Sequence, residues 1–315
     1  MSETKSEVSN NDILGDLFRG SKHSLKYIEK KTFKYDKNGV LLKKIPYTNN
    51  FDYYPVHIAR FALGNLECYL EKKDKRYKKI FFDQVNWLFK NLVYKDDFAV
   101  WEHHYTLPYY KFNKIPWTHG LGQGLGMIVL LKAYQITEEK KYLDAVMKTL
   151  HSFNIDIDKE GVRFMDEEKN IWLEEYAIYP PPHVLNGFIT ILFCVNEIYR
   201  STKDKNALEL WNQGLKTVKK KLECYDAGYW SYYDLLRKVP SKENYHRMHV
   251  RQLKQLYKLT GFQLFKNKSV KWQSLYNKKI NHLRVKAMRN IYFVKNYGFI
   301  GSIKRLNEIN NYKKN

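Results

Sequence analysis

The sequence lacks long apolar runs and is poor in cysteine. It contains no stretch of about 18 consecutive apolar residues, which a membrane-spanning helix requires. Its first twenty residues are polar and lack the apolar core of a signal peptide. The three cysteines, Cys68, Cys194 and Cys224, form no C-x-x-C pair. That pattern predicts a reducing compartment and no structural zinc. Together, these absences predict a soluble, cytoplasmic protein.

Acidic residues are also scarce. The chain has 33 Asp and Glu against 55 Lys and Arg, which gives a formal net charge of +22. Such a balance favours a polyanionic partner, whether nucleic acid, anionic lipid or acidic polysaccharide. No nucleic-acid-binding motif accompanies the charge, so nucleic acid is not predicted. The 26 Tyr and 7 Trp residues suit a sugar-binding surface, and they suit an ordinary core equally well.

A nucleotide-binding loop does not account for the glycines at every second position from Gly120 to Gly126. No Lys-Ser or Lys-Thr follows them, as a Walker loop requires, and no strand precedes them, as the Rossmann fingerprint requires. In a helix, Gly120 and Gly124 share one face. Each glycine costs roughly 0.5–1 kcal/mol relative to alanine. The run therefore predicts close approach by a packed neighbouring helix or by a ligand, with Gln123 offering a hydrogen-bonding side chain.

A weak internal repeat organises the rest of the chain. Each copy has an apolar helix ending in an aromatic residue, a polar turn and a second amphipathic helix. Because one hairpin cannot bury its own apolar face, the copies must stack or close into a ring. The predicted fold is an all-α, α/α toroid, an incomplete barrel of about four hairpins; the alternative is an irregular helical bundle. The copies are residues 58–89, 126–153, 187–218 and 249–276, aligned on Tyr69, Tyr134, Tyr199 and Tyr257, with Thr137, Thr202 and Thr260 in three of the turns.

The two ends of the chain differ from this middle part. Residues 1–50 predict a flexible leader and a short β-hairpin-like segment, with a turn at Asp36–Gly39. Residues 51–277 form the main domain. Residues 278–315 form a basic helical appendage, because residues 266–315 contain 13 Lys or Arg and one acidic residue, Glu308. Such an appendage can cover the ring or touch an anionic membrane surface.

Metal ligands are hard to assemble from this sequence. His103 and His104 are adjacent and point apart on most backbones, while His246 and His249 are spaced i, i+3 without a nearby acidic ligand. No G-x-S-x-G nucleophile motif occurs. The sequence therefore predicts neither a metal nor a hydrolase triad.

Acids and phenols in the segments between hairpins offer other chemistry. Glu174 and Glu175 lie between Trp172 and Tyr176, just before three prolines that must end any helix. A carboxylate among aromatic rings can have its pKa raised by desolvation, as a general base requires; the alternative is a solvated surface acid. Further phenols and cations lie at Tyr232, Tyr233, Arg237, Tyr245 and Arg247.

In combination these stretches resemble the C-terminal domain of D-glucuronyl C5-epimerases. The resemblance covers residues 50–277, and "FDYYPVHIARFALGNLECYL" is similar to the lead-in of that domain. The motifs that carry it are, in order, W-x-x-G-x-x-Q-G (Trp117–Gly124), AY-x-x-T (Ala133–Thr137), W-x-E-E-Y (Trp172–Tyr176), VLNGF (Val184–Phe188), YDL (Tyr233–Leu235) and YH-x-x-H-x-x-QL (Tyr245–Leu253).

The resemblance implies an α/α barrel that converts D-glucuronate to L-iduronate within a heparosan-like or other acidic polysaccharide, without cofactor or metal. It places catalytic roles at Glu175, Tyr233 and Tyr245. It also allows a homodimer. Our hypothesis is that Glu175 removes the C5 proton on one face of the sugar and Tyr245 delivers a proton on the other. The residues expected to bind substrate are Trp117, Gln123, Glu174, Tyr176, Asn186, Arg237, His246 and His249.

The sequence departs from the family pattern at several points. Leu236 displaces the arginine of the family's YDLR motif by one position, to Arg237. His119 stands where animal members have a small polar residue, and their β-rich N-terminal domain has no counterpart in this sequence. Two other functions stay open. One is a polysaccharide lyase, which removes the same proton but then expels the C4 oxygen, and the other is a non-catalytic polyanion-binding module.

Overall fold

The structure is a computed structural model that describes Leu25, residues 33–45 and residues 49–314, with side chains described except at residue 108 and from 297 onward. Most of the predicted flexible leader lies outside the described residues. The chain divides into two compact units. Unit 1 comprises residues 1–101 and 125–149, and unit 2 comprises residues 102–124 and 150–315. The domain boundaries expected at residues 50 and 277 stay a prediction.

Unit 1 begins with a three-stranded antiparallel sheet of β1 (Phe33–Tyr35), β2 (Leu41–Lys44) and β3 (Phe51–Tyr53). The turn between β1 and β2 forms because Asp36 Oδ1 accepts the N–H groups of Asn38 and Val40, both at 2.8 Å. Gly39 supplies the positive φ of 77° that the turn requires. The predicted hairpin is thus confirmed, while β3 was not predicted.

The helices of unit 1 are α3 (Pro55–Lys72), α4 (Lys75–Lys90), the later part of α5 (Gly120–Thr137) and most of α6 (Lys140–His151), with short strands β4 (Val93–Tyr94) and β5 (Ala99–Val100). The fully buried Gln84 joins α4 to the β1–β2 turn. Its amide donates to Gly39 O at 2.8 Å and accepts from Leu41 N–H at 3.0 Å. One side chain therefore satisfies two backbone groups that would otherwise be buried without partners.

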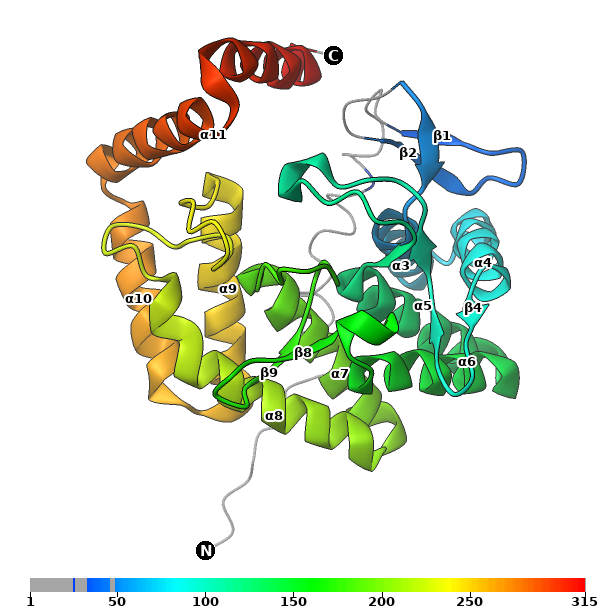
Figure 1. Cartoon of the computed structure of the whole chain (residues 1–315). Coiled ribbons are helices and arrows are strands. Elements are labelled where there is room, and N and C mark those ends of the chain that lie inside the picture. Colours follow the sequence, from blue (N-terminus) through cyan, green and yellow to red (C-terminus); the bar gives the residue numbers. More distant parts are fainter. Residues whose placement is uncertain (1–24, 26–32, 46–48, 315) are drawn as a thin grey trace, which may run out of the picture. The chain divides into compact units, whose positions relative to one another are not determined.

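Unit 2 contains the remaining helices and four short strands (Figure 1). Its hairpins are β6 with β7 and β8 with β9. None of the described helices of the protein is long and apolar enough to cross a membrane. The strands are β6 (Glu102–His103), β7 (Trp117–Thr118), β8 (Arg163–Met165) and β9 (Ile171–Leu173); the helices are α7 (Leu185–Thr202), α8 (Lys205–Lys221), α9 (Glu243–Thr260), α10 (Gln263–Tyr276) and α11 (Lys279–Lys314); and the 3-10 turns are η1 (Pro108–Tyr110), η2 (Ser152–Asn154), η3 (Ile157–Lys159) and η4 (Leu222–Tyr225).

The four predicted hairpins are confirmed as α3–α4, α5–α6, α7–α8 and α9–α10. They share one terminating geometry. In each, the carbonyl of the aligned tyrosine accepts the N–H of the residue four positions later, at 2.7–2.8 Å. That later residue has a positive φ of 57–71° in every copy. In three copies the turn threonine donates to the carbonyl four residues back and accepts an N–H two residues ahead. The repeat therefore encodes the helix ends as well as the helices.

The glycines of α5 allow close packing. A Cβ built on Gly124 would lie 3.3 Å from the Cβ and Sγ atoms of Cys194 in α7. One built on Gly126 would lie 2.4 Å from the Trp101 ring. A Cβ on Gly120 would lie 2.1 Å from the carbonyl oxygen of Glu174. Close packing is therefore confirmed at these three positions, and the expected neighbouring helix is present at Gly124, whereas Gly126 faces the Trp101 ring and Gly120 faces the backbone of Glu174.

Candidate active site

The segment that carries Glu174 and Glu175 is fixed by backbone hydrogen bonds on both sides. It follows β9, which pairs with β8 in the register Arg163↔Leu173. Glu174 N–H then donates to Val162 O at 2.8 Å, and Glu175 O accepts the N–H of Gly120 at 2.9 Å. These bonds hold the two glutamates just after β9, where the chain bends at Glu175 and runs against the first turn of α5. Their side chains contact different residues: Glu174 contacts His183, and Glu175 lies against Gly187.

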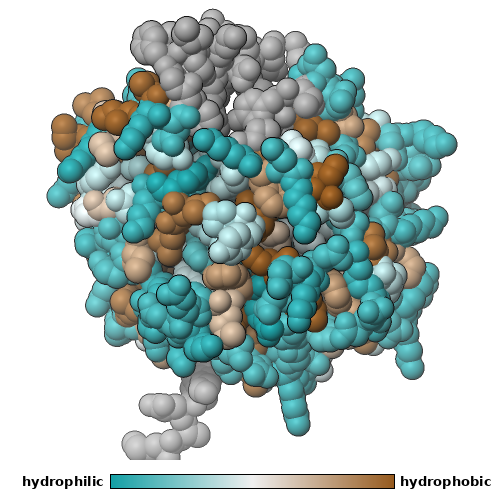
Figure 2. Space-filling view, in the orientation of Figure 1, coloured by the Kyte–Doolittle hydropathy of each residue, from teal (hydrophilic) through white to brown (hydrophobic). Residues whose placement is uncertain are grey.

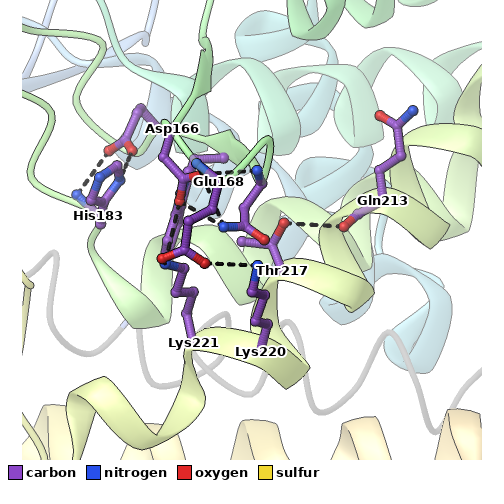
Figure 3. A network of polar contacts seen from close by, with 10 residues as sticks. Asp166, Glu168, His183, Gln213, Thr217, Lys220 and Lys221 are labelled. Atoms are coloured by element: carbon purple, nitrogen blue, oxygen red, sulfur yellow. Dashed lines mark hydrogen bonds and ion pairs between the residues drawn. The ribbon is translucent and has the colours of Figure 1, made fainter.

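Lysine side chains of α8 form ion pairs with the turn between β8 and β9 (Figure 3). Glu168 forms ion pairs with Lys220 at 2.7 Å and Lys221 at 2.8 Å. Asp166 accepts hydrogen bonds from Asn170 N at 2.9 Å and Trp172 Nε1 at 3.1 Å. Burial acts to raise the pKa of Asp166, but these hydrogen bonds prevail and lower it to about 2. The ionised Asp166 thus fixes the turn just before the glutamates.

Glu174 is a buried partner of His183. One carboxylate oxygen accepts the backbone N–H of His183 at 3.0 Å, and the other contacts His183 Nδ1. The imidazole also stacks on Trp172, with ring centroids 4.1 Å apart. Both oxygens of Glu174 are therefore engaged by one residue. No pattern in the sequence indicates this pair; His183 directly follows the three prolines.

Glu175 lies against the first turn of α7. A Cβ built on Gly187 would fall 2.1 Å from Glu175 Oε2, so the carboxylate rests directly on the bare backbone at that glycine. Helix N-termini favour negative charge because their N–H groups and macrodipole point at it. The side chain is only 7% exposed. The glycine of the VLNGF motif thus has a physical role, which is to make room for a buried carboxylate beside the first turn of α7.

His119 faces the same carboxylate. Its Nε2 lies 3.9 Å from Glu175 Oε1, and its Nδ1 accepts the N–H of Gly122 at 3.2 Å. Because Nδ1 acts as an acceptor, a neutral imidazole carries its proton on Nε2, the atom that faces Glu175. His119 was treated in the sequence only as a departure from the family pattern. The structure brings it to the site.

The two tyrosines with predicted catalytic roles pack against each other. The rings of Tyr233 and Tyr245 meet edge to face, with centroids 4.8 Å apart. Burial raises the pKa of Tyr233 well above its usual value, and the negative charge of Glu175 raises it further. At neutral pH Tyr233 is therefore protonated and acts as a hydrogen-bond or proton donor. The charge of Glu175 thus acts on the Tyr233 phenol, and the Tyr233 ring packs on the Tyr245 ring.

Aromatic rings line the region around Tyr176. Its centroid lies 4.9 Å from His119, 5.1 Å from Tyr110 and 6.1 Å from Trp117. Trp117 Nε1 donates to Tyr105 O at 2.7 Å, which fixes the indole. Tyr110 was not predicted from the sequence, because it lies in η1, far along the chain from Tyr176.

Arg237 is held within the protein. It forms an ion pair with the buried Asp234, and its guanidinium lies over the rings of Tyr109 at 3.5 Å and Tyr110 at 4.2 Å. Its Nη2 donates to Tyr110 Oη at 3.2 Å. Burial acts to lower the pKa of Arg237, but Tyr110 and Asp234 raise it above its usual value. In this arrangement the arginine orients Tyr110.

His246 and His249, which were expected to bind substrate, are buried on α9. Ser231 Oγ lies 2.7 Å from His246 Nδ1 and 2.8 Å from His249 Nδ1. His246 Nε2 lies 3.0 Å from Trp272 O, and its ring stacks on Trp230 with centroids 3.9 Å apart. Both ring nitrogens of His246 therefore have partners within the protein. Among the described residues, no group of three or more His, Cys, Asp or Glu side chains is arranged to hold a metal ion.

These histidines predict a pH-dependent stability. Burial lowers the pKa of His246 to about 4 and that of His249 to about 3. Because the folded-state values lie below the unfolded value, the stabilisation is complete above about pH 6.5 and is lost as the pH falls toward 4. We expect the unfolding free energy, measured by urea denaturation, to drop by about 3 kcal/mol for each of the two histidines over this range. His249→Gln should flatten the curve and His104→Gln, whose imidazole is 66% exposed, should not. An unfolding free energy unchanged down to pH 4 would contradict this expectation.

Gln123 and Asn186 lie in the first turns of α5 and α7, the two helix N-termini next to Glu175. Both residues are buried. The backbone carbonyl of Asn186 accepts the amide of Gln252 at 2.9 Å, which links α7 to α9. The QL pair of the last sequence motif thus connects the helix that seats Glu175 to the helix that carries Tyr245.

Comparison with known proteins identifies the family of the chain. The model of the D-glucuronyl C5-epimerase C-terminus matches residues 95–274. The D-glucuronyl C5-epimerase of Caenorhabditis elegans is 28% identical over 241 residues, which are 68% of this chain and 38% of that protein. An uncharacterized protein of Methanocaldococcus jannaschii is 34% identical over 179 residues, or 56% of this chain and 58% of its own length. The chain therefore spans less than two thirds of each of these relatives.

A solved structure shows the fold. A family 76 glycoside hydrolase from a bovine Bacteroides thetaiotaomicron strain superimposes with a TM-score of 0.50 at 14% identity, covering 84% of this chain and 57% of the hydrolase. The predicted all-α fold of the α/α-toroid type is confirmed. The family match covers more than half of the 315 residues. The chain therefore belongs to the family of the D-glucuronyl C5-epimerase C-terminus.

Proposed function

We propose that the protein inverts C5 of D-glucuronate residues in an acidic, heparosan-like polysaccharide and so forms L-iduronate. The observation that carries this proposal is the position of Glu175. Its carboxylate is buried against the bare backbone of Gly187, and its charge acts on the Tyr233 phenol, whose ring packs on that of Tyr245. A two-face proton transfer requires a base on one face and a proton donor on the other, and a carboxylate and a phenol are suited to these two roles.

Glu175 removes the C5 proton in this proposal. That hydrogen lies α to a carboxylate, so its removal adds negative charge to a group that is already anionic. Positive or proton-donating groups must offset this charge in the transition state. The bare backbone at Gly187 leaves room for the Glu175 carboxylate, and Nε2 of His119 lies 3.9 Å from its Oε1. Tyr233, protonated at neutral pH because burial raises its pKa, donates a hydrogen bond to the developing charge.

Tyr245 returns a proton to the opposite face of the sugar. It lies in the first turn of α9, is partly exposed and contacts Tyr233. Its phenol can therefore meet substrate while its ring is oriented by packing. The rings of Trp117 and Tyr176 offer flat apolar surfaces to pyranose C–H groups. Arg237 acts as a positioning residue through Tyr110. No metal or cofactor takes part in this scheme.

The direct test uses heparosan and the whole protein in D₂O. C5 deuteration with iduronate formation, observed by NMR, is the expected result. An unsaturated product that absorbs in the near ultraviolet would instead establish the lyase reaction. Binding of heparosan without isotope exchange would establish the non-catalytic binding module. Either outcome would overturn the proposal. A cytoplasmic location and a homodimer stay predictions.

Tyr245→Phe removes the proton donor assigned to the face of the sugar opposite Glu175. The change removes one oxygen but keeps the ring that packs on Tyr233. We expect the rate of iduronate formation to fall by about 10²-fold or more, with KM little changed. The matched control is Tyr257→Phe, at the other end of α9, which should keep full activity. A Tyr245→Phe variant as active as the parent would remove this phenol from the mechanism.

A further inference from the structure

Helix α11 has one face packed on unit 2 and another left exposed. Asn281 and Val285 are each only 7% exposed. Arg289 Nη1 donates to Pro240 O at 2.7 Å, and Arg284 lies 4.1 Å from the Tyr229 ring. These contacts fix the rotation of the helix about its axis from Lys279 to Asn296. The opposite face is therefore directed away from the rest of unit 2.

The exposed face is apolar. Ile280 is 67% exposed, Leu283 65%, Ile291 58% and Val294 43%, and Ala287 is also exposed. Their spacing of three and four residues places all five within an arc of about 80°, at 3.6 residues per turn. Figure 2 shows hydrophobic residues among hydrophilic ones at the upper left, where Figure 1 has the first part of α11. Five apolar side chains in one exposed row indicate a surface that binds a partner.

Basic side chains border this face on both sides. Lys279 and Lys286 lie along one edge, and Arg284 and Lys295 lie along the other. No acidic residue occurs between residues 279 and 296. An apolar row with positive charges on both borders is the pattern of a helix that lies in a membrane interface.

We propose that α11 binds an anionic membrane surface, with Ile280, Leu283, Ala287, Ile291 and Val294 inserted among the lipids and the flanking cations at the headgroups. The charges and the apolar row together discriminate between the three candidate partners of this face, which are a second copy of the chain, an acidic polysaccharide and anionic lipid. A second copy of the helix would bring cations against cations, since no acidic residue is present to pair with them. An acidic polysaccharide would pair with the cations but would leave the apolar row in water. Anionic lipid satisfies both features at once.

The experiment is flotation of the whole protein with vesicles. Vesicles of phosphatidylcholine with phosphatidylglycerol should carry the protein upward in a density gradient, and pure phosphatidylcholine vesicles should not. Added salt should weaken the binding, because screening acts on the cations. The double substitution Leu283→Asp and Ile291→Asp should reduce binding by at least about tenfold. The matched control is Leu70→Asp in α3, where the side chain is 55% exposed; it should bind as the parent does.

Three results would overturn the proposal. They are no flotation with anionic vesicles, equal flotation with neutral ones, and undiminished binding by the double variant, which would mean that charge alone acts. A dimer seen by light scattering and lost only in the double variant, without vesicle binding, would identify a second copy as the occupant. Helix content by circular dichroism confirms that each variant is folded. Because the readout is binding, its failure leaves the proposed epimerase reaction untouched.

Discussion

Glu175→Gln should abolish exchange of the C5 hydrogen with D₂O, lowering the rate by on the order of 10³-fold. Glutamine has nearly the same shape as glutamate, so its side chain can still rest on Gly187 and face His119. It cannot accept the proton. The loss should therefore appear in the exchange rate, while heparosan affinity changes little. Isotope exchange followed by NMR measures the chemical step directly, before any later step can hide it.

The matched control is Glu167→Gln, in the exposed turn between β8 and β9. It makes the same chemical change in the same segment without touching the site, and full activity is expected. Urea unfolding should show both variants as stable as the parent within about 1 kcal/mol. Normal exchange by Glu175→Gln would rule out this carboxylate as the base and would leave the phenols of Tyr233 and Tyr245 as the candidate bases.

Local patterns made much of the fold predictable. The hairpins could be located because each copy repeats its apolar period, its tyrosine and its turn threonine, all within about thirty residues. The threonine hydroxyls bond only to backbone groups within four residues of them. The β1–β2 turn was predictable for the same reason. Strand β3 was not, because its pairing with β2 depends on a neighbouring strand rather than on its own short pattern.

The sequence predicted which acid and which phenols belong to the candidate site, but it did not predict the contacts between them and their neighbours. Glu175, Tyr233 and Tyr245 came from motifs, whereas the contact of His119 with Glu175 joins residues more than fifty positions apart. The pairing of Arg237 with Tyr110 spans an even longer separation. A sequence also cannot tell which of two adjacent glutamates is engaged. Glu174 is held by His183, while Glu175 lies on Gly187. That difference depends on the bend at Glu175 and on contacts with residues farther along the chain, which no local pattern records.

Gly187→Ala should lower the rate of C5 exchange by about 10²-fold, although no reacting group is altered. The added methyl carbon would fall 2.1 Å from Glu175 Oε2 and 2.7 Å from its Cδ, far inside van der Waals contact. Either the carboxylate or the first turn of α7 must then move. Displacement of a base by about an ångström is enough for such a loss. The matched control is Gly124→Ala, whose methyl carbon would lie 3.3 Å from Cys194 Cβ and Sγ and would leave Glu175 in place.

A double-mutant cycle shows whether the clash with Glu175 is the cause. Alanine is favoured over glycine inside a helix by roughly 0.5–1 kcal/mol, so Gly187→Ala would be stabilising if nothing opposed the new methyl group. In the parent the clash opposes it, and the unfolding free energy should fall. In a Glu175→Gly background the opposing side chain is gone, and the same change should be neutral or stabilising. Additive free energies in the cycle would mean that the two residues do not interact, and α7 would then not be the seat of the catalytic base.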